Sequence, residues 1–262
     1  MSKDILVTVI GDDVFARDWM SLLLVRDWRT RVVSEITSKE DFNIFKQDGF
    51  QKVDFLLVDL DSLPDEPGLI THILDDDAIL DPAKLLLVGS KPDPKALRSI
   101  PPHLFAGYLL KDEILSSLAW AITFAAEGST VFTPTTLDLA YEQNFAVPEK
   151  KIILRSRNIP GLTDRQTDIA KLAIIFSIGR RDLADELKIS DQWSYGMVSE
   201  LYTKLGLSEI FDGGIDAYRY MENDEVIRAH ITEILEDLGS SKKARDVETL
   251  AFHLLTMPSI EY

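Results

Sequence analysis

Four charged side chains in the first half of this 262-residue chain stand at the ends of short apolar runs. They are the acid pair Asp12 and Asp13, the single acid Asp59, and Lys111. Carboxylates are ligands that Mg²⁺ prefers, and an aspartate can accept a phosphoryl group while a lysine balances its charge. The pattern predicts a Mg²⁺ and phosphoryl site with Asp59 as nucleophile, Asp12, Asp13 and Asp59 as metal ligands and Lys111 as counter-charge. The plainer interpretation is that these are solvated loop residues.

The apolar runs predict the elements that would bring these side chains together. They alternate with amphipathic stretches, which is typical of a parallel sheet covered by helices. In such sheets ligands bind outside the carboxyl ends of the strands. We therefore expect a doubly wound, five-stranded parallel α/β domain of the flavodoxin-like type over residues 1–128. Its strands are expected at residues 5–10, 31–36, 53–60, 84–88 and 107–110.

The second half of the chain has a helical pattern. Residues 129–158 are expected to form a linker, although a partial helix is indicated near residues 137–141. Thr163 and Gln166 are spaced as a helix-capping box, and Ser190 is expected to cap a second helix. An all-α helix-turn-helix domain is expected over residues 159–221, followed by an acidic helical extension over residues 222–262. Its apolar stripes are expected to pack on the helix-turn-helix or between two protomers.

Residues 5–127 resemble the receiver domain of bacterial two-component response regulators. Residues 9–13 resemble its acidic-pair strand, residues 54–60 its phosphoacceptor strand and residues 107–112 its lysine strand. The resemblance implies that Asp59 accepts a phosphoryl group from a histidine kinase or a small phosphodonor, with Mg²⁺ as cofactor. It also implies that Tyr108 is an aromatic switch residue.

The expected switch region departs from that family. The family has Ser or Thr at the end of its fourth strand, where this chain has Gly89. Ser90 follows and can take this place only if the loop begins early, because neighbouring strand residues point to opposite faces. The helix expected near residues 94–100 is short and is followed by two prolines, which cannot continue it. These departures predict an atypical regulator.

Residues 162–207 resemble the C-terminal DNA-binding domain of the NarL/LuxR class of response regulators. The resemblance lies in residues 162–165, 182–190 and 198–207, which are mainly positions that form the fold. It implies a helix-turn-helix that binds DNA, and a homodimer is the expected assembly. The candidate DNA contacts are Arg165, Arg180, Arg181, Lys188, Gln192, Trp193, Tyr195, Ser199 and Lys204.

The charge of the chain predicts that DNA binding is weak. Net charge is −16, and only residues 151–207 are slightly basic, with 9 Lys and Arg against 7 Asp and Glu. Phosphate neutralisation supplies most non-specific affinity for DNA. Trp193, Tyr195 and Met197 stand where the family usually has Thr, Lys and His. Trp193 and Met197 are interpreted as partly buried, as contacts for a protein partner, or as DNA contacts.

Three functions follow from these patterns. The first is a transcriptional response regulator that is not an enzyme, and the second is a pseudo-response regulator that acts without phosphorylation through protein–protein contacts. The third is a nucleotide-dependent enzyme, which is disfavoured because no glycine-rich phosphate loop follows the first run. The chain contains no cysteine and no apolar stretch of roughly 18 to 20 residues. We therefore expect a cytoplasmic protein without a membrane partner.

Overall fold

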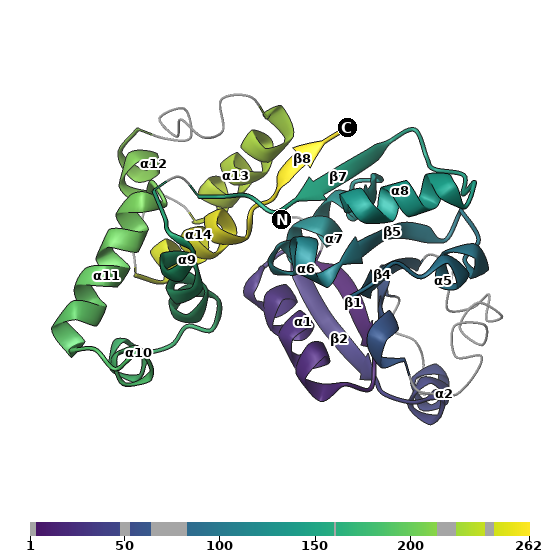
Figure 1. The fold of residues 1–262 in the computed structure, drawn as a ribbon, viewed down its shortest axis with the longest axis horizontal. Coiled ribbons are helices and arrows are strands. Elements are labelled where there is room, and N and C mark those ends of the chain that lie inside the picture. The colour runs from purple at the N-terminus through teal and green to yellow at the C-terminus, as the bar shows by residue number, and fades with distance from the viewer. Residues whose placement is uncertain (1–3, 48–52, 64–82, 160, 214–223, 239–243) are drawn as a thin grey trace. The chain divides into compact units, whose positions relative to one another are not determined.

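The chain forms two compact units. The computed structural model describes residues 4–47, 53–63, 83–159, 161–213, 224–238 and 244–262 (Figure 1). The first unit comprises Met1–Arg157 together with Pro258–Tyr262, and the second comprises Asn158–Met257. None of the helices in the described ranges combines the length and apolar character that crossing a membrane requires.

The first unit is built on one eight-stranded sheet in the order β2-β1-β3-β4-β5-β6-β7-β8. All neighbouring strands are parallel except β7 and β8. The order of the first five strands is the doubly wound, flavodoxin-like one, so the predicted fold class is confirmed. The strand count was wrong, because three further strands extend the sheet. The strands are β1 (Ile5–Ile10), β2 (Thr30–Ile36), β3 (Phe55–Asp59), β4 (Lys84–Gly89), β5 (Phe105–Leu110), β6 (Thr130–Phe132), β7 (Lys151–Arg155) and β8 (Ser259–Glu261).

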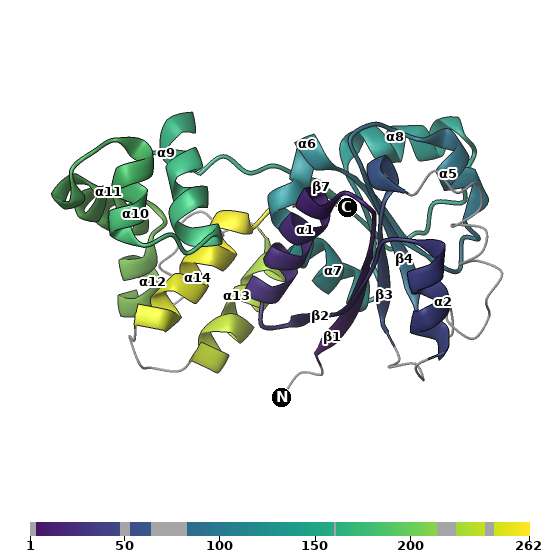
Figure 2. The same ribbon diagram turned by 90° about the horizontal axis from the view of Figure 1, so that it is seen from below.

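Helices cover both faces of this sheet (Figure 2). Helices α2, α5 and α8 lie on one face, and α1 and α7 lie on the other. Strands β3 and β5 are buried along their whole length, which explains their continuous apolar sequences. The helical elements are α1 (Val14–Arg26), α2 (Lys39–Gln47), η1 (Leu60–Ser62), α5 (Pro94–Ser99), α6 (Lys111–Ile114), η2 (Leu115–Ser117), α7 (Leu118–Ala126) and α8 (Pro134–Glu142).

Residues 129–158 are not a plain linker, because β6, α8 and β7 continue the parallel sheet. Strand β6 has only three residues, and all of them are buried. Phe132 pairs with Tyr108 of β5, and the Thr136 hydroxyl donates to the Tyr108 carbonyl oxygen at 2.6 Å. A three-residue strand carries almost no periodicity, so its tertiary partners, which the sequence pattern does not reveal, decide its structure.

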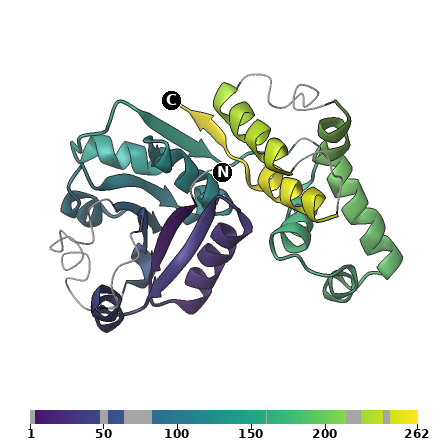
Figure 3. The same cartoon turned by 180° about the vertical axis from the view of Figure 1, so that it is seen from behind.

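The chain returns to the sheet at its C-terminal end. Strand β8 pairs antiparallel with β7, with Arg155 opposite Ser259 and Ile153 opposite Glu261 (Figure 3). The helical unit is therefore inserted between two strands that are neighbours in the sheet. The expectation of an all-helical extension to residue 262 was wrong for these last residues, because their strand partner lies about 100 positions earlier in the sequence.

The second unit is helical within the described residues. Thr163 and Gln166 form the predicted capping box, and the Ser190 side chain accepts from the Trp193 backbone N–H as the predicted cap. Helix α14 packs against η3 and α12, and α13 packs against α14, so the extension packs within the helical unit. The expected boundary at residue 222 lies outside the described residues. The elements are α9 (Asp164–Ala170), the π-helical turn η3 (Lys171–Ile175), α10 (Arg180–Leu187), α11 (Asp191–Lys204), α12 (Leu207–Gly213), α13 (Glu225–Leu238) and α14 (Ala244–Thr256).

Candidate functional site

The structure brings Asp59 and Lys111 together at the carboxyl edge of the sheet. Asp59 is the last residue of β3, and Lys111 directly follows β5. The Lys111 Nζ atom lies 2.6 Å from Asp59 Oδ1. The Asp59 side chain is fully buried, whereas that of Lys111 keeps 18% exposure. The contact between the two residues predicted from the sequence is therefore direct.

Ser62 holds the other carboxylate oxygen of Asp59. Its hydroxyl donates to Asp59 Oδ2 at 2.8 Å, and the Asp61 backbone N–H donates to Asp59 Oδ1 at 3.2 Å. Gly11 provides the room for this contact, because a Cβ atom at position 11 would lie 2.6 Å from the Ser62 Oγ. Both oxygens of Asp59 are thus engaged. No pattern in the sequence marks Ser62, because its role depends on the tight turn η1.

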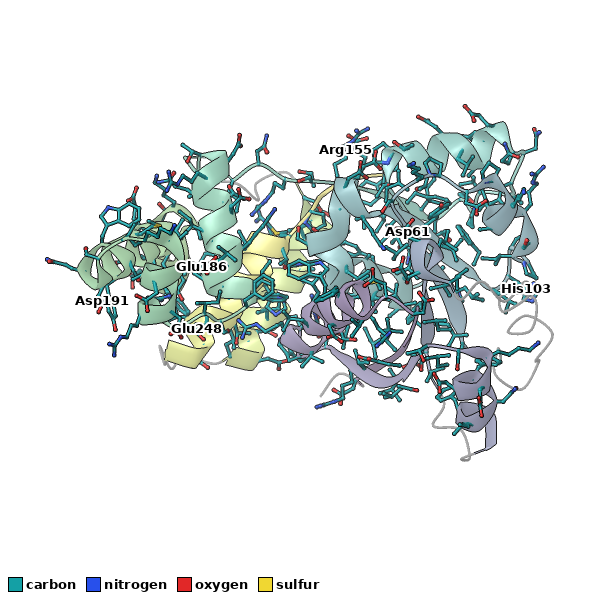
Figure 4. The ribbon with its side chains drawn as sticks, turned by 60° about the horizontal axis from the view of Figure 1, so that its bottom comes forward. Asp61, His103, Arg155, Glu186, Asp191 and Glu248 are labelled. Carbon is teal, nitrogen blue, oxygen red and sulfur yellow. The ribbon has the colours of Figure 1, made fainter. Side chains whose placement is uncertain are left out.

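Asp61 is a second carboxylate in contact with Lys111, and no pattern in the sequence marks it either. It lies in η1, beyond the end of β3 (Figure 4). Its Oδ2 atom is 2.9 Å from Lys111 Nζ. Both oxygens accept from the Ser90 backbone N–H, at 2.9 and 2.8 Å, and Oδ2 also accepts from the Ser90 hydroxyl at 2.7 Å. Asp61 therefore bridges Lys111 and Ser90.

These contacts fix the charges of Lys111 and Asp61. Partial burial acts to lower the pKa of Lys111, but hydrogen bonds to Asp59 and Asp61 outweigh it and raise that pKa above its usual value. Partial burial acts to raise the pKa of Asp61, but hydrogen bonds from Lys111 and Ser90 hold that pKa below its usual value. Near neutral pH the site contains an ammonium between two acidic residues, and Asp61 is ionised.

The acid pair does not complete a metal site with Asp59. The Asp13 carboxylate caps α1 by accepting from the Phe15 and Ala16 backbone N–H groups. Asp12 is exposed, and its backbone N–H donates to the Ser62 carbonyl oxygen at 2.7 Å. Among the residues that the structure describes, no three acidic or histidine side chains are placed to hold a metal ion. The side chains are of the type that Mg²⁺ prefers, but their arrangement does not fit a bound ion.

The residues of the expected switch region lie in and beside the loop after β4. Strand β4 ends at Gly89, so Ser90 is already in the loop, and its hydroxyl points to Asp61. Tyr108 is buried and points inward: its hydroxyl donates to the Lys91 carbonyl oxygen at 2.9 Å and accepts from the Asp93 N–H at 2.8 Å. Burial raises the pKa of Tyr108 to about 12. The loop is thus held at both of its ends.

The candidate DNA contacts lie on and around α11. Trp193 and Tyr195 on this helix are 49% and 63% exposed, whereas Met197 is buried. Lys204 is paired with Glu200 at 2.9 Å and donates to Gln166 at 3.2 Å. Arg180 lies over the Tyr202 ring and is partly buried. The remaining candidates, Arg165, Arg181, Lys188, Gln192 and Ser199, are exposed.

A groove of about 970 Å³ runs between the start of α9 and the first turns of α11. It is lined by polar and apolar residues, including Arg165, Gln192 and Trp193. Gly196 also lines it, and a Cβ atom there would meet nothing within 4 Å. The groove therefore gives access to the backbone of α11.

Comparison with known proteins finds similarity only to solved structures. No protein-family model matches the chain, and no curated protein matches it. The response regulator ChrA of a heme-sensing two-component system is 23% identical, with a TM-score of 0.40, over 78% of this chain and 90% of that one. The Salmonella typhimurium response regulator RcsB, in a structure described for its DNA interaction, is 15% identical, with a TM-score of 0.46, over 79% and 93%.

The isolated REC domain of RcsB from Salmonella enterica serovar Typhimurium, in the presence of phosphomimetic BeF3⁻, is also similar. It is 16% identical, with a TM-score of 0.44, and the match covers 52% of this chain and 99% of that one. The chain is thus similar to solved response regulators, and its doubly wound fold follows independently from its own strand order.

Proposed function

We propose that this chain is an atypical response regulator of the NarL/LuxR type. In this proposal the first unit is a receiver with Asp59 as phosphoacceptor, and the second is a DNA-binding unit that regulates transcription in the cytoplasm. The observation that carries the proposal is the 2.6 Å contact between Lys111 Nζ and Asp59 Oδ1 at the carboxyl edge of a doubly wound sheet. Ligands of such sheets bind at this edge.

The chemistry that we propose is attack of an Asp59 carboxylate oxygen on the phosphorus of a donor. The bond between phosphorus and the leaving group breaks, and the leaving group is acetate for acetyl phosphate or an imidazole for a histidine kinase. The product is an acyl phosphate on Asp59. Because the pKa of Lys111 is raised, its ammonium remains available to balance the added negative charge.

Acetyl phosphate tests the phosphoacceptor. The full chain is incubated with it, with and without Mg²⁺, and the intact mass is measured. We expect a gain of one phosphoryl group in the wild type and none in Asp59→Asn. Asp112→Asn is the matched control, because Asp112 is an exposed acid beside Lys111. Omission of Mg²⁺ tests whether labelling depends on the ion, and an unlabelled wild type with the ion present refutes the phosphoacceptor.

The DNA-binding part of the proposal predicts weak binding that falls only modestly as salt rises. Residues 158–257 contain 11 Lys and Arg against 18 Asp and Glu, so few phosphates are neutralised. Exposed Arg181 in the first turn of α10 and exposed Lys188 just before α11 are the supporting observations. Binding of the chain to a library of genomic DNA fragments, measured at rising salt, tests this part, and the double variant Arg181→Ala/Lys188→Ala should bind more weakly. Sedimentation of the chain tests the proposed homodimer.

Two observations favour a second function, a phosphorylation-independent regulator that acts through protein contacts. Asp59 is fully buried with both oxygens engaged, and the exposed face of α11 carries Trp193 and Tyr195. Large exposed apolar side chains on a polar face commonly mark interfaces. An unlabelled wild type that also fails to bind DNA at low salt supports this alternative.

A further inference from the structure

Lys111 and Ser90, the residues that would bind a phosphoryl group in this site, already bind the carboxylate of Asp61. Lys111 Nζ is shared between Asp59 Oδ1 at 2.6 Å and Asp61 Oδ2 at 2.9 Å. The Ser90 backbone N–H and hydroxyl both donate to the Asp61 carboxylate. An ammonium, a hydroxyl and a backbone N–H are the donors that bind phosphoryl oxygens. Here all three converge on Asp61.

We propose that Asp61 is a built-in anion that draws Ser90 to Lys111 and holds the loop after β4 closed without phosphorylation. The proposal rests on the proposed function, because it takes Lys111 and Ser90 as the groups that would otherwise bind the phosphoryl group on Asp59. Asp61 acts as a positioning residue, since it sets where the two donors lie. The receiver is then closed in its resting state.

The loop after β4 connects this site to the start of α5. The Tyr108 hydroxyl hydrogen-bonds to the backbone of Lys91 and Asp93 at the far end of the loop. The Asp93 carboxylate also caps α5 by accepting from the Lys95 and Ala96 backbone N–H groups. Ser90 and Asp93 thus connect the site to the start of α5. Loss of the Asp61 contact frees the near end of the loop, whereas the Tyr108 contact keeps the far end in place.

Asp61 is more than a surface ion pair. An exposed pair contributes little because long side chains lose rotational freedom and water screens the charges. Asp61 instead accepts from a backbone N–H and a short hydroxyl side chain, which lose little freedom, in addition to Lys111. Hydrogen bonds to an ionised acceptor are roughly twice as strong as those between neutral groups.

Hydrogen exchange at the Ser90 amide tests the proposal in the full, unphosphorylated chain. We expect exchange on the order of tenfold to a hundredfold faster in Asp61→Ala than in the wild type, because that amide loses a charged acceptor. Asp61→Asn keeps one oxygen acceptor without the charge and should lie between the two. Asp112→Asn removes an exposed acid that is next to Lys111 in the sequence, and it should leave Ser90 exchange unchanged. Unchanged Ser90 exchange in Asp61→Ala overturns the proposal, as does equal acceleration in Asp112→Asn.

A second arm separates this proposal from the proposed function. Mg²⁺ and beryllofluoride, a phosphoryl mimic, are added to Asp61→Ala, and we expect slow exchange at Ser90 to return because the mimic supplies the missing anion. If Ser90 exchange rises in Asp61→Ala but neither acetyl phosphate nor beryllofluoride acts on any variant, the phosphoacceptor fails and the built-in anion stands. If acetyl phosphate labels Asp59 but Asp61→Ala leaves Ser90 protected, the built-in anion fails and the phosphoacceptor stands.

Discussion

Replacement of Lys111 by Met removes the ammonium from a buried carboxylate while keeping a side chain of similar length. Removing one partner of a buried ion pair costs about 3–5 kcal/mol, because the remaining charge is left uncompensated. Two observations reduce that cost here. Asp59 keeps the hydrogen bonds from Ser62 and the Asp61 backbone, and Lys111 is 18% exposed, so water can replace it in part. We expect Lys111→Met to lower the free energy of unfolding by about 2–3 kcal/mol.

Urea unfolding followed by tryptophan fluorescence measures this change. The chain has four tryptophans, and Trp193 alone lies in the helical unit. A Trp193→Phe background therefore makes the signal report on the first unit, through Trp19, Trp28 and Trp120. This separation matters because two units need not unfold in one transition.

The double variant tests the reason for the cost. In an Asp59→Asn background the buried group is neutral, so Lys111→Met should cost about 2 kcal/mol less than it does alone. A Lys111→Met variant within about 0.5 kcal/mol of the wild type, which is the usual size of a surface substitution, refutes the reasoning. The same cost in both backgrounds refutes it as well.

Three further predictions concern single positions. Gly11→Ala should lower the free energy of unfolding by about 1–3 kcal/mol, because the added Cβ would lie 2.6 Å from the Ser62 Oγ. Much of this loss should disappear in a Ser62→Ala background, which lacks that oxygen. Urea unfolding measures both, and an equal cost in the two backgrounds contradicts the contact. Gly196→Ala should stabilise the helical unit by about 0.5–1 kcal/mol, because the site is an exposed helix interior with open space; a lower melting temperature by circular dichroism contradicts this. Tyr108 in the folded chain should ionise near pH 12, whereas a tyrosine in the unfolded chain ionises near pH 10. Between these two pH values the unfolded chain releases a proton that the folded chain keeps. The free energy of unfolding should therefore fall as pH rises from about 10 to about 12. Tyr108→Phe should remove the last step of the alkaline absorbance titration, and a titration without a late step in the wild type contradicts the burial of the hydroxyl.

Long periodic segments made much of the fold predictable from the sequence. The continuous apolar runs of β3 and β4 and the capped helices α9 and α11 carry their signals locally. Strands β6 and β8 do not, because each has three residues and takes its structure from distant partners. For the same reason residues 129–158 were mistaken for a linker.

The candidate site was predictable only in part. Asp59 and Lys111 could be paired because residues that end parallel strands meet at one edge. Asp61 and Ser62 follow Asp59 directly, but their roles depend on the turn η1, which folds them back over the strand end. No spacing rule predicts that turn. The same turn explains why Asp59 is bonded to Ser62 and Lys111 and is not grouped with Asp12 and Asp13.

The intact mass of the full chain after incubation with acetyl phosphate and Mg²⁺ tests the central claim most directly. If Asp59 is a phosphoacceptor supported by Lys111, the wild type gains one phosphoryl group and Asp59→Asn gains none. A wild type that gains nothing, or an Asp59→Asn variant that still gains a phosphoryl group, contradicts the account.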